Sequence, residues 1–397
     1  MKETVFVSAA RTPIGKYMGS LKTVRIQDLA AHTMKAAIER AGIDSGSLDM
    51  SIYSQSMQSS LPANVGRHAW TLAGLSEDPA GYTLNTLCAG ALQTMISGFN
   101  KIVGDEYQGM LVGGVESYSM TQFYLYHPRY EMGPWSMCLH DQKIEVETSA
   151  QPQEQYGALT AATLADLVAR NYGFVRKDLD AYTLRDHEKA MNAIADRRVG
   201  GDIAPYLIKT KKKETVVNAD QIPRETTLEE LMALSSINEG GTATAANVAP
   251  WADAAVSLVM LSVPKAQELG CKPLAKMRGF GIAAGNPTLL ERTSVKSIDK
   301  ALAMCGLSRE AIDFYNIHTP SAAYGLAVGD MLGAAAAGKI NVEGGSLAFG
   351  HPGAAIGGIM AANMIKTLER AGARFGLVNV GALGGQALTI VIEGMSE

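Results

Sequence analysis

The chain has 397 residues, of which 47% are apolar and 41 are glycine, and its formal net charge at pH 7 is −4. This composition excludes a disordered or fibrous protein and is typical of a globular α/β protein rich in tight turns. Such a length favours two domains, or two fused halves, over a single core. The three consecutive lysines at 211–213 are too few to indicate nucleic-acid binding, and we expect them in a solvated turn.

The cysteines lie far apart, at Cys88, Cys138, Cys271 and Cys305. No two of them form a C-x-x-C pair, so the sequence predicts neither a disulfide framework nor a structural zinc site and favours a reducing compartment. The opening MKETVFVSAARTP lacks the apolar region of a signal peptide, and no stretch is long and apolar enough to span a bilayer. We therefore expect a cytoplasmic protein that binds neither nucleic acid nor membrane.

Apolar strands alternate with amphipathic helices from the beginning of the chain. TVFVSAA (4–10) is a predicted strand, 26–43 has a helical period of apolar residues, and MLVGGVES (110–117) is a predicted buried strand. This βαβ alternation favours a largely parallel sheet covered by helices, which is an α/β fold.

The rhythm changes between residues 119 and 243. This segment contains an aromatic loop, two predicted helices and a predicted hairpin, at 122–135, 159–173, 179–201 and 206–218. Apolar strand character returns at 254–262. We interpret 119–243 as an inserted α+β region that lies on the first sheet.

The second half of the chain repeats the order of elements in the first. The segments 88–99, 109–117 and 253–261 have counterparts at 351–365, 375–385 and 385–393. The long insertion has no counterpart. The pattern predicts a duplicated α/β unit. Its N-terminal half would comprise 1–118 and 244–268, and its C-terminal half 269–397.

Residues that could take part in catalysis stand at the N-termini of two helices that occupy equivalent places in the two halves. Cys88 heads the helix of the first half, and His351 takes the same place in the second. If the halves pack about a pseudo-twofold axis, these corners face each other. A helix N-terminus favours a thiolate, and an imidazole could take the thiol proton, so the pair would form a nucleophile able to accept an acyl group. The structural alternative is a buried apolar cysteine and a His-Pro helix start.

His318 is a third candidate. It follows the predicted strand AIDFYNI, at the carboxyl end where α/β sheets place functional groups. A hydrogen-bonded loop histidine is the alternative reading.

Five stretches together resemble the thiolase family of coenzyme A–dependent acyltransferases. They are VSAARTPIGKYMGSL (7–21), LNTLCAGALQTM (84–95), GGVESYSM (113–120), VVNADQIPRETTLEEL (216–231) and GGSLAFGHPGAAIG (344–357). The resemblance implies two βαβαβαββ halves in a five-layer α-β-α-β-α sandwich, with the inserted region covering the active site and coenzyme A. It also implies coenzyme A as a substrate, with no permanently bound cofactor and no metal.

The resemblance implies roles for several residues. Cys88 would be the nucleophile that becomes acylated, and His351 would activate it. His318 stands where many thiolases have Asn, and its N–H could hold the thioester oxygen of the second substrate. The backbone N–H groups of Cys88 and Leu383 would form the other oxyanion hole.

One departure concerns the second catalytic cysteine of the family, whose place is taken by Gly381. His318, assisted by His351, is the candidate base in its stead. The set Cys88, His318 and His351 then also resembles that of decarboxylating ketosynthases, which leaves a condensing enzyme as an alternative. A non-catalytic acyl-CoA-binding subunit is an alternative of another class.

Other departures concern the substrate. Ala249 stands where the family often has a serine that meets the pantetheine arm. Arg224 is a candidate for the coenzyme A nucleotide, with a surface salt bridge as the structural alternative. The inserted region carries aromatic residues that could line a pocket for an unusual or aromatic acyl group, namely Phe123, Tyr124, Tyr126, Tyr130 and Trp135. His127, Cys138 and His140 lack metal-ligand spacing and are interpreted as structural.

The sequence thus predicts a thiolase that cleaves a 3-oxoacyl-CoA with coenzyme A, through acyl-Cys88, to an acyl-CoA and a shorter CoA thioester. The resemblance implies a homodimer or homotetramer. It also admits a small zinc-bearing OB-fold partner subunit, as in a benzoylsuccinyl-CoA thiolase.

Overall fold

The computed structural model describes residues 3–125, 138–209, 211 and 213–395. Its N-terminal half contains the helices α1 (Ile26–Ala41), α2 (Val65–Leu72) and α3 (Gly90–Val103). The strands of this half are β1 (Thr4–Arg11), β2 (Gly15–Lys16), β3 (Met50–Ser54), β4 (Ala80–Leu84), β5 (Gly109–Ser117) and β10 (Ala252–Ser262).

The C-terminal half repeats this plan. Its strands are β11 (Ala275–Ala284), β12 (Phe314–Ile317), β13 (Phe375–Ala382) and β14 (Gln386–Gly394), and its longer helices are α10 (Leu290–Cys305), α11 (Ala322–Leu332) and α13 (Ile356–Ala371). The counterpart of β4 is reduced to a single bridge between Tyr315 and Ile340. The predicted duplication is therefore present, with one strand of the second copy shortened.

The strands form one continuous sheet in the order β12-β13-β14-β11-β1-β10-β5-β3-β4, with β2 paired to β10. The two halves join where Thr4–Phe6 of β1 pairs with 275–277 of β11. Among the described strands of this sheet, the parallel pairs are β3 with β4, β3 with β5, and β12 with β13. The prediction of a largely parallel sheet was therefore wrong. The last two strands of each half pair antiparallel, because β14 follows β13 through a tight turn and β10 returns beside β5 after the insertion.

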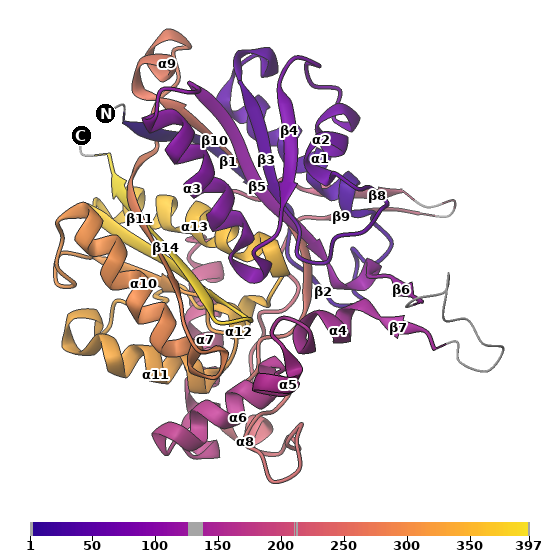
Figure 1. The fold of residues 1–397 in the computed structure, drawn as a ribbon, viewed down its shortest axis with the longest axis vertical. Coiled ribbons are helices and arrows are strands. Elements are labelled where there is room, and N and C mark those ends of the chain that lie inside the picture. Colours follow the sequence, from indigo (N-terminus) through magenta and orange to yellow (C-terminus); the bar gives the residue numbers. More distant parts are fainter. Residues whose placement is uncertain (1–2, 126–137, 210, 212, 396–397) are drawn as a thin grey trace.

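Helices complete five layers. α1 and α2 cover the outer face of the first sheet, α3 and α13 lie together between the halves, and α10 and α11 cover the second sheet (Figure 1). The expected α-β-α-β-α sandwich is confirmed. The central layer needs small residues, since a Cβ at Gly357 would lie 2.8 Å from Leu92 and one at Gly358 would collide with Val256.

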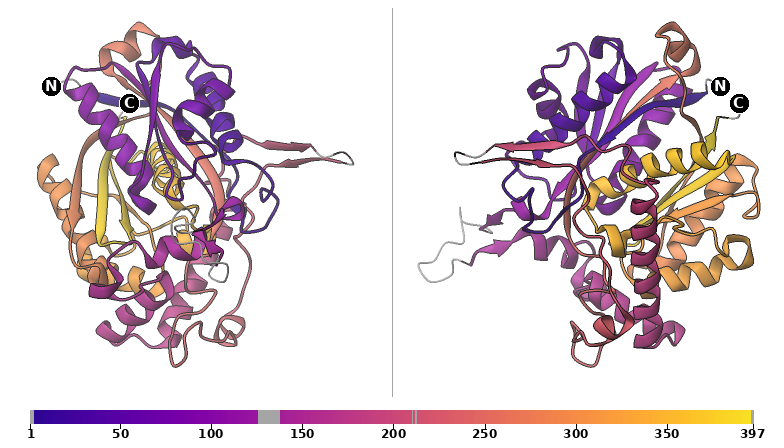
Figure 2. Two further views of the ribbon diagram at one scale, coloured as in Figure 1. Left: turned by 45° about the vertical axis from the view of Figure 1, so that its right-hand side comes forward. Right: turned by 180° about the vertical axis from the view of Figure 1, so that it is seen from behind.

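The segment between β5 and β10 packs mainly on the second half. It contains β6 (Phe123–Tyr124), β7 (His140–Asp141), α4 (Gln142–Thr148), α5 (Gln153–Tyr156), α6 (Ala161–Tyr172), α7 (Arg176–Ala195), β8 (Tyr206–Lys209), β9 (Glu214–Val217) and α8 (Leu228–Met232). The predicted hairpin at 206–218 is confirmed as β8 and β9, which project from the body (Figure 2). The remaining helices are α9 (Val263–Glu268) and α12 (Ser346–Phe349). No helix in the described ranges is long and apolar enough to cross a membrane.

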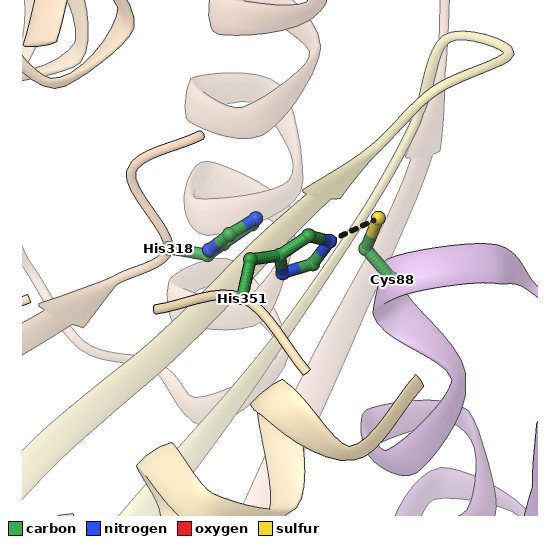
Figure 3. A group of neighbouring side chains, drawn as sticks. All are labelled: Cys88, His318 and His351. Atoms are coloured by element: carbon green, nitrogen blue, oxygen red, sulfur yellow. Dashed lines mark hydrogen bonds between the residues drawn. The ribbon is translucent and has the colours of Figure 1, made fainter. Parts of the chain in front are cut away.

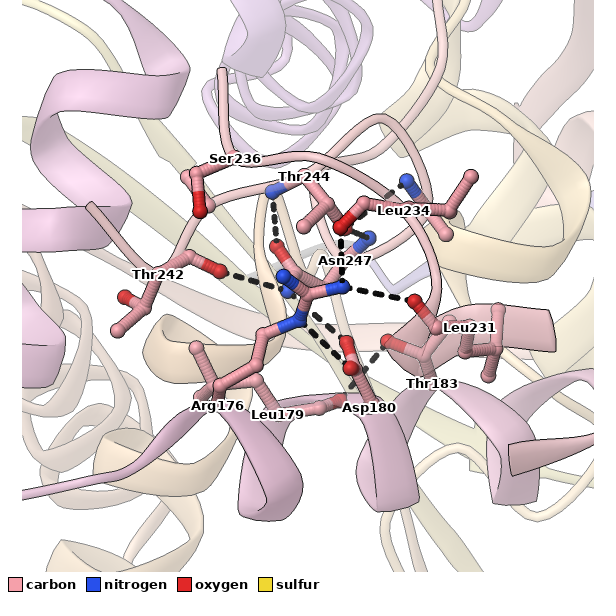
Figure 4. A network of polar contacts seen from close by, with 12 residues as sticks. Arg176, Leu179, Asp180, Thr183, Leu231, Leu234, Ser236, Thr242, Thr244 and Asn247 are labelled. Atoms are coloured by element: carbon pink, nitrogen blue, oxygen red, sulfur yellow. Dashed lines mark hydrogen bonds and ion pairs between the residues drawn. The ribbon is translucent and has the colours of Figure 1, made fainter. Parts of the chain in front are cut away.

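A buried polar network fixes the loop that leads into β10 (Figure 4). Arg176 donates to Asp180 at 2.6 Å and to the carbonyl of Leu231 at 2.7 Å. Asn247 donates to Asp180 at 3.2 Å, and its own Oδ1 accepts the backbone N–H of Thr244 at 2.8 Å. The loop at 242–249 is thereby held against α7.

A second buried network ties the insertion to β1. Arg11 is 1% exposed and donates to Asp202 at 3.0 Å and to Asp220 at 2.7 Å. Burial acts to lower the pKa of Arg11, but the charges of Asp202 and Asp220 outweigh it and raise that pKa. Asp220 also accepts the backbone N–H of Ile14 at 2.8 Å. One guanidinium thus neutralises two buried carboxylates.

Replacing Arg11 by alanine should therefore leave both carboxylates buried without a counter-ion. We expect Arg11→Ala to lower the free energy of unfolding by about 3–5 kcal/mol in urea denaturation. The matched control is Arg25→Ala, because Arg25 pairs with Asp28 at 2.7 Å while 60% exposed, and should cost less than about 1 kcal/mol. Equal effects of the two substitutions would contradict this role for Arg11.

Candidate active site

Cys88 lies in a single 3-10 turn (Leu87–Ala89) between β4 and α3. Leu87 has φ of 51°, a left-handed conformation that a leucine rarely adopts. Asn85 supports this corner by accepting the Leu87 N–H at 2.9 Å. A Cβ at Gly90 would collide with Ser54 Oγ, so the helix beginning must be glycine. Strain of this kind is typical of functional sites.

His351 approaches from the other half. Its N–H donates to the carbonyl of Pro250 at 2.8 Å, and its own carbonyl accepts the Ala252 N–H at 3.2 Å, which fixes the backbone. The ring Nε2 lies 3.1 Å from Cys88 Sγ (Figure 3). The structure therefore brings together the two corners that the sequence predicted would face each other.

His318 lies directly beside this pair. It follows β12, and its N–H donates to the carbonyl of Asn379 at 2.9 Å. Its ring stacks on that of His351, with centroids 4.5 Å apart and planes at 24° (Figure 3). Nδ1 forms a 2.7 Å hydrogen bond with Ser346 Oγ, whereas Nε2 is buried with no hydrogen-bond partner among the described residues. This orphaned nitrogen is available to a ligand.

The protein environment keeps all three groups neutral. Burial, followed by the charges of Glu147 and Glu116, raises the pKa of Cys88 to about 12. Burial lowers the pKa of His351 to about 4, and burial and His351 lower that of His318 well below 6.5. The expected depressed thiol pKa was therefore wrong, because desolvation outweighs the helix terminus. The resting site is a thiol hydrogen-bonded to an imidazole.

Backbone groups also act on the sulfur. The backbone groups of Cys88 and Leu383 act to lower the pKa of Cys88, against the effect of burial. Leu383 has no left-handed φ, unlike the following Gly384 and Gly385 at 81° and 79°. A leucine side chain is therefore compatible with this backbone position.

Two carboxylates near the site, Glu116 and Glu147, are not among the site residues predicted from the sequence. Glu116 accepts the N–H groups of Ser56 at 2.9 Å and of Ala354 at 3.2 Å, so it links the two halves. Glu147 accepts Trp251 Nε1 at 3.2 Å and the Ala161 N–H at 2.9 Å. Glu116 could have been found from the sequence, because it is a charged residue within the otherwise uncharged, predicted buried stretch GGVES. Glu147 lies in α4, whose sequence gave no such signal.

A cavity of about 50 Å³ adjoins the sulfur. Most of its wall is apolar, and its titratable members are Cys88, Tyr118, Glu147, His318, Tyr324 and His351. Gly381 also lines it. A larger cleft of about 700 Å³ borders this cavity at Glu147, Ala161, Pro320 and His351. The cleft therefore leads from the outside to the reactive sulfur.

Arg224 and Ala249 both line the larger cleft, together with Lys16, Tyr17 and Trp251. Ala249 donates its N–H to the carbonyl of Pro320 at 2.9 Å. Arg224 is exposed and forms no ion pair with any residue in the described part of the chain. The surface salt bridge that could have explained Arg224 is thus not found there.

The aromatic residues expected in the acyl pocket do not line it where they are described. Phe123 is 64% exposed, and Tyr124 bonds to Glu145 away from the cavity, because β6 lies on a projecting hairpin. Tyr126, His127, Tyr130 and Trp135 lie outside the described residues. His140 pairs with Glu145 and Cys138 is exposed, so neither joins a metal group. In the described ranges, only Cys88, His318 and His351 are close enough to hold a metal, with ligand atoms within 4.8 Å.

Comparison with known proteins agrees with this geometry. Residues 4–263 match the family model "Thiolase, N-terminal domain", and residues 271–394 match "Thiolase, C-terminal domain". The chain is 32% identical to the acetyl-CoA acetyltransferase of Escherichia coli K12, covering 99% of both chains. It is 34% identical to the beta-ketoadipyl-CoA thiolase of Pseudomonas aeruginosa, covering 99% of this chain and 100% of the other.

Solved structures give the same result. The Bacillus anthracis acetyl-CoA acetyltransferase superposes with a TM-score of 0.95 at 29% identity, covering 100% of this chain and 99% of the other. Human mitochondrial 3-ketoacyl-CoA thiolase superposes with a TM-score of 0.91 at 28% identity, covering 99% of each. The chain therefore belongs to the thiolase family of coenzyme A–dependent acyltransferases.

Proposed function

We propose that the protein cleaves a 3-oxoacyl-CoA with coenzyme A through an acyl-Cys88 intermediate. The observation that carries the proposal is the 3.1 Å contact between Cys88 Sγ and His351 Nε2 beside a cavity that opens to a large cleft. His351 takes the thiol proton as sulfur attacks the 3-oxo carbon. Coenzyme A then removes the acyl group from Cys88.

Oxyanions form twice, and we assign a donor set to each. The N–H groups of Cys88 and Leu383 face the sulfur and would stabilise the alkoxide at the carbonyl under attack. His318 Nε2 would hold the thioester oxygen of the departing enolate. His318 Nδ1 is already bonded to Ser346 Oγ and Nε2 has no partner among the described residues, which favours this donor role over that of the base expected from the sequence.

We propose that the segment 119–243 covers both the active site and coenzyme A. Support comes from Glu147 and Ala161, which adjoin the cavity, and from His187 and Arg224, which line the cleft. The nucleotide end of coenzyme A would lie near Arg224 and Lys16, since an unpaired cation suits a phosphate. The pantetheine arm would pass Ala249.

The acyl group transferred to Cys88 would be uncharged and apolar. No Lys or Arg lines the cavity in the described part of the chain, so a terminal carboxylate would find no counter-ion. An aromatic acyl group requires the wall to move, because a cavity of about 50 Å³ is below the roughly 150 Å³ of a dry apolar cavity known to bind benzene.

A decarboxylating ketosynthase remains the second candidate, because its active site also contains one cysteine and two histidines and His318 stacks on His351. The two activities differ in the carbon donor, since only the ketosynthase releases CO₂ from a malonyl thioester.

The assembly is also a proposal. We propose a homodimer or homotetramer and, for an aromatic substrate, a small zinc-bearing OB-fold partner. Support comes from exposed apolar side chains on two hairpins, Phe123, Leu139, Leu207 and Val216. Gel filtration of protein purified from its native source would test the homo-oligomer, and zinc analysis of the same protein would test the zinc-bearing partner.

The proposed function predicts a thioester on Cys88. Incubation with a panel of aliphatic and aromatic 3-oxoacyl-CoAs should give a mass adduct on Cys88 and release the shorter CoA thioester, and Cys88→Ser should give neither. Cys305→Ser is the matched control, because Cys305 is remote from the cavity. Absence of an adduct with every thioester would favour a non-catalytic binding subunit, and CO₂ release from malonyl-CoA would favour the ketosynthase.

The lowered pKa of His351 predicts an unusual pH profile for Cys88 acylation. The base is available only while neutral, so kcat/KM for acylation should be flat at neutral pH and fall only as pH drops through about 4. His351→Ala should lower the rate by about 10²–10⁴-fold. Single-turnover mass spectrometry would measure the pH dependence of acylation and the acylation rate of His351→Ala, and circular dichroism would confirm that the variant is folded. An acid limb between pH 6 and 7 would contradict the assignment.

The cation in the cleft predicts selectivity for the nucleotide part of coenzyme A. Arg224→Ala should raise KM for coenzyme A about tenfold, through loss of one charge-assisted contact. KM for pantetheine, which lacks the nucleotide, should not change. Arg25→Ala serves as a control for the loss of an exposed arginine outside the cleft. An equal effect on both thiols would place the nucleotide elsewhere.

A further inference from the structure

Cleavage by the proposed function leaves two proton transfers without an assigned group. When the C2–C3 bond breaks, its electron pair stays on C2 of the departing thioester, and C2 must receive a proton. In the second half of the reaction, the coenzyme A thiol must lose one. A single group that first gives and then takes a proton serves both steps.

The backbone at Gly381 faces the cavity but carries no side chain. A Cβ built there would lie 2.5 Å from Tyr324 Oη and 2.9 Å from Ser294 Oγ. The phenol thus occupies the space that a side chain at 381 would fill. A larger residue at 381 and the present position of Tyr324 exclude each other.

Packing holds Tyr324 in this position. Its ring comes from α11, is 1% exposed and belongs to an apolar cluster that includes Leu290 and Val328. Its hydroxyl is hydrogen-bonded to Ser294 Oγ of α10, which is fully buried. Tyr324 also adjoins the reaction site, since it lines the same cavity as Cys88 and His318.

We propose that Tyr324, supported by Ser294, is the catalytic acid and base that replaces a side chain at position 381. Tyr324 Oη gives its proton to C2 as the C2–C3 bond breaks, and the resulting phenolate accepts a hydrogen bond from Ser294 Oγ. The phenolate then takes the proton of the coenzyme A thiol. The new thiolate attacks the acyl carbonyl, and Cys88 sulfur leaves and recovers its proton from His351.

The protonation state of Tyr324 agrees with this order of events. Burial raises its pKa, while the hydrogen bond from Ser294 acts in the opposite direction. The group therefore rests as a neutral phenol, which is the form that can donate to a carbanion, and the hydroxyl partner stabilises the anion once formed.

Other groups at the cavity are less suited to this transfer. His351 is engaged with Cys88, and Glu147 already accepts hydrogen bonds from Trp251 and Ala161. His318 is held by Ser346 through Nδ1. Tyr118 is a second phenol at the cavity, but it stacks on Trp251 and is not among the atoms that surround Gly381.

The inference rests on the proposed function and is tested separately from it. The readouts are cleavage of the 3-oxoacyl-CoA that wild type prefers, exchange of the C2 hydrogens of the shorter product thioester in D₂O, and acylation of Cys88 by an acyl thiophenyl ester. The thiophenyl group leaves as a thiolate without needing a proton, so this last reaction bypasses Tyr324. If wild-type protein neither cleaves nor becomes acylated, the proposed function itself fails.

We expect Tyr324→Phe to lower cleavage and C2 exchange at least about 100-fold, while acylation by the thiophenyl ester stays within about threefold of wild type. Ser294→Ala should lower both proton-dependent rates about tenfold with acylation retained. Tyr315→Phe removes a hydroxyl from the same apolar cluster outside the cavity and controls for packing. Wild-type cleavage and exchange in Tyr324→Phe, or loss of exchange in Tyr118→Phe instead, would overturn the proposal.

Discussion

The close packing of α3 against α13 is the constraint on which the rest of the site depends. Cys88 lies in the turn that leads into α3, and His351 precedes the short turn that leads into α13. Gly357 lets α13 approach Leu92 of α3, and Gly358 lets it approach Val256 of β10. The distance between Cys88 and His351 is therefore set by the core of the protein rather than by flexible loops. Glu116 reinforces it by accepting N–H groups from both halves.

Burial gives the site its electrostatic character. In water a thiol and an imidazole of ordinary pKa values would partly exchange a proton. Here desolvation penalises both the thiolate and the imidazolium, so the neutral pair is the resting state. Under the proposed function, proton transfer would accompany attack on the substrate, when the oxyanion donors compensate the charge. A reactive thiolate is thus not exposed between turnovers.

Much of the fold and part of the site could be predicted from the sequence. The order of elements indicated the duplication, and the matching positions of Cys88 and His351 indicated that they meet. The alternation of strands and helices could not predict the antiparallel pairing of β10 and β14. These directions depend on how the chain returns after the insertion, for β10, and after the tight turn, for β14. The sign of the Cys88 pKa shift depends on burial, which the residues around position 88 do not reveal.

Tyr324 was beyond prediction for a different reason. Nothing in its surrounding sequence distinguishes it from a core tyrosine of α11, and Ser294 lies on another helix. Only the packing of α10 and α11 beside Gly381 brings Tyr324 to the cavity with the Ser294 hydroxyl as its partner. The glycine itself was a usable signal, since a missing side chain at a reactive position leaves room for one from elsewhere.

The cavity beside Cys88 and the outer cleft share part of their wall, at Glu147, Ala161, Pro320 and His351. A thioester arm that reaches the sulfur must pass these residues, and so must the arm that leaves. The first product therefore vacates the passage before the second substrate enters it. Under the proposed function, the shape of the entrance would therefore impose the order of binding and release.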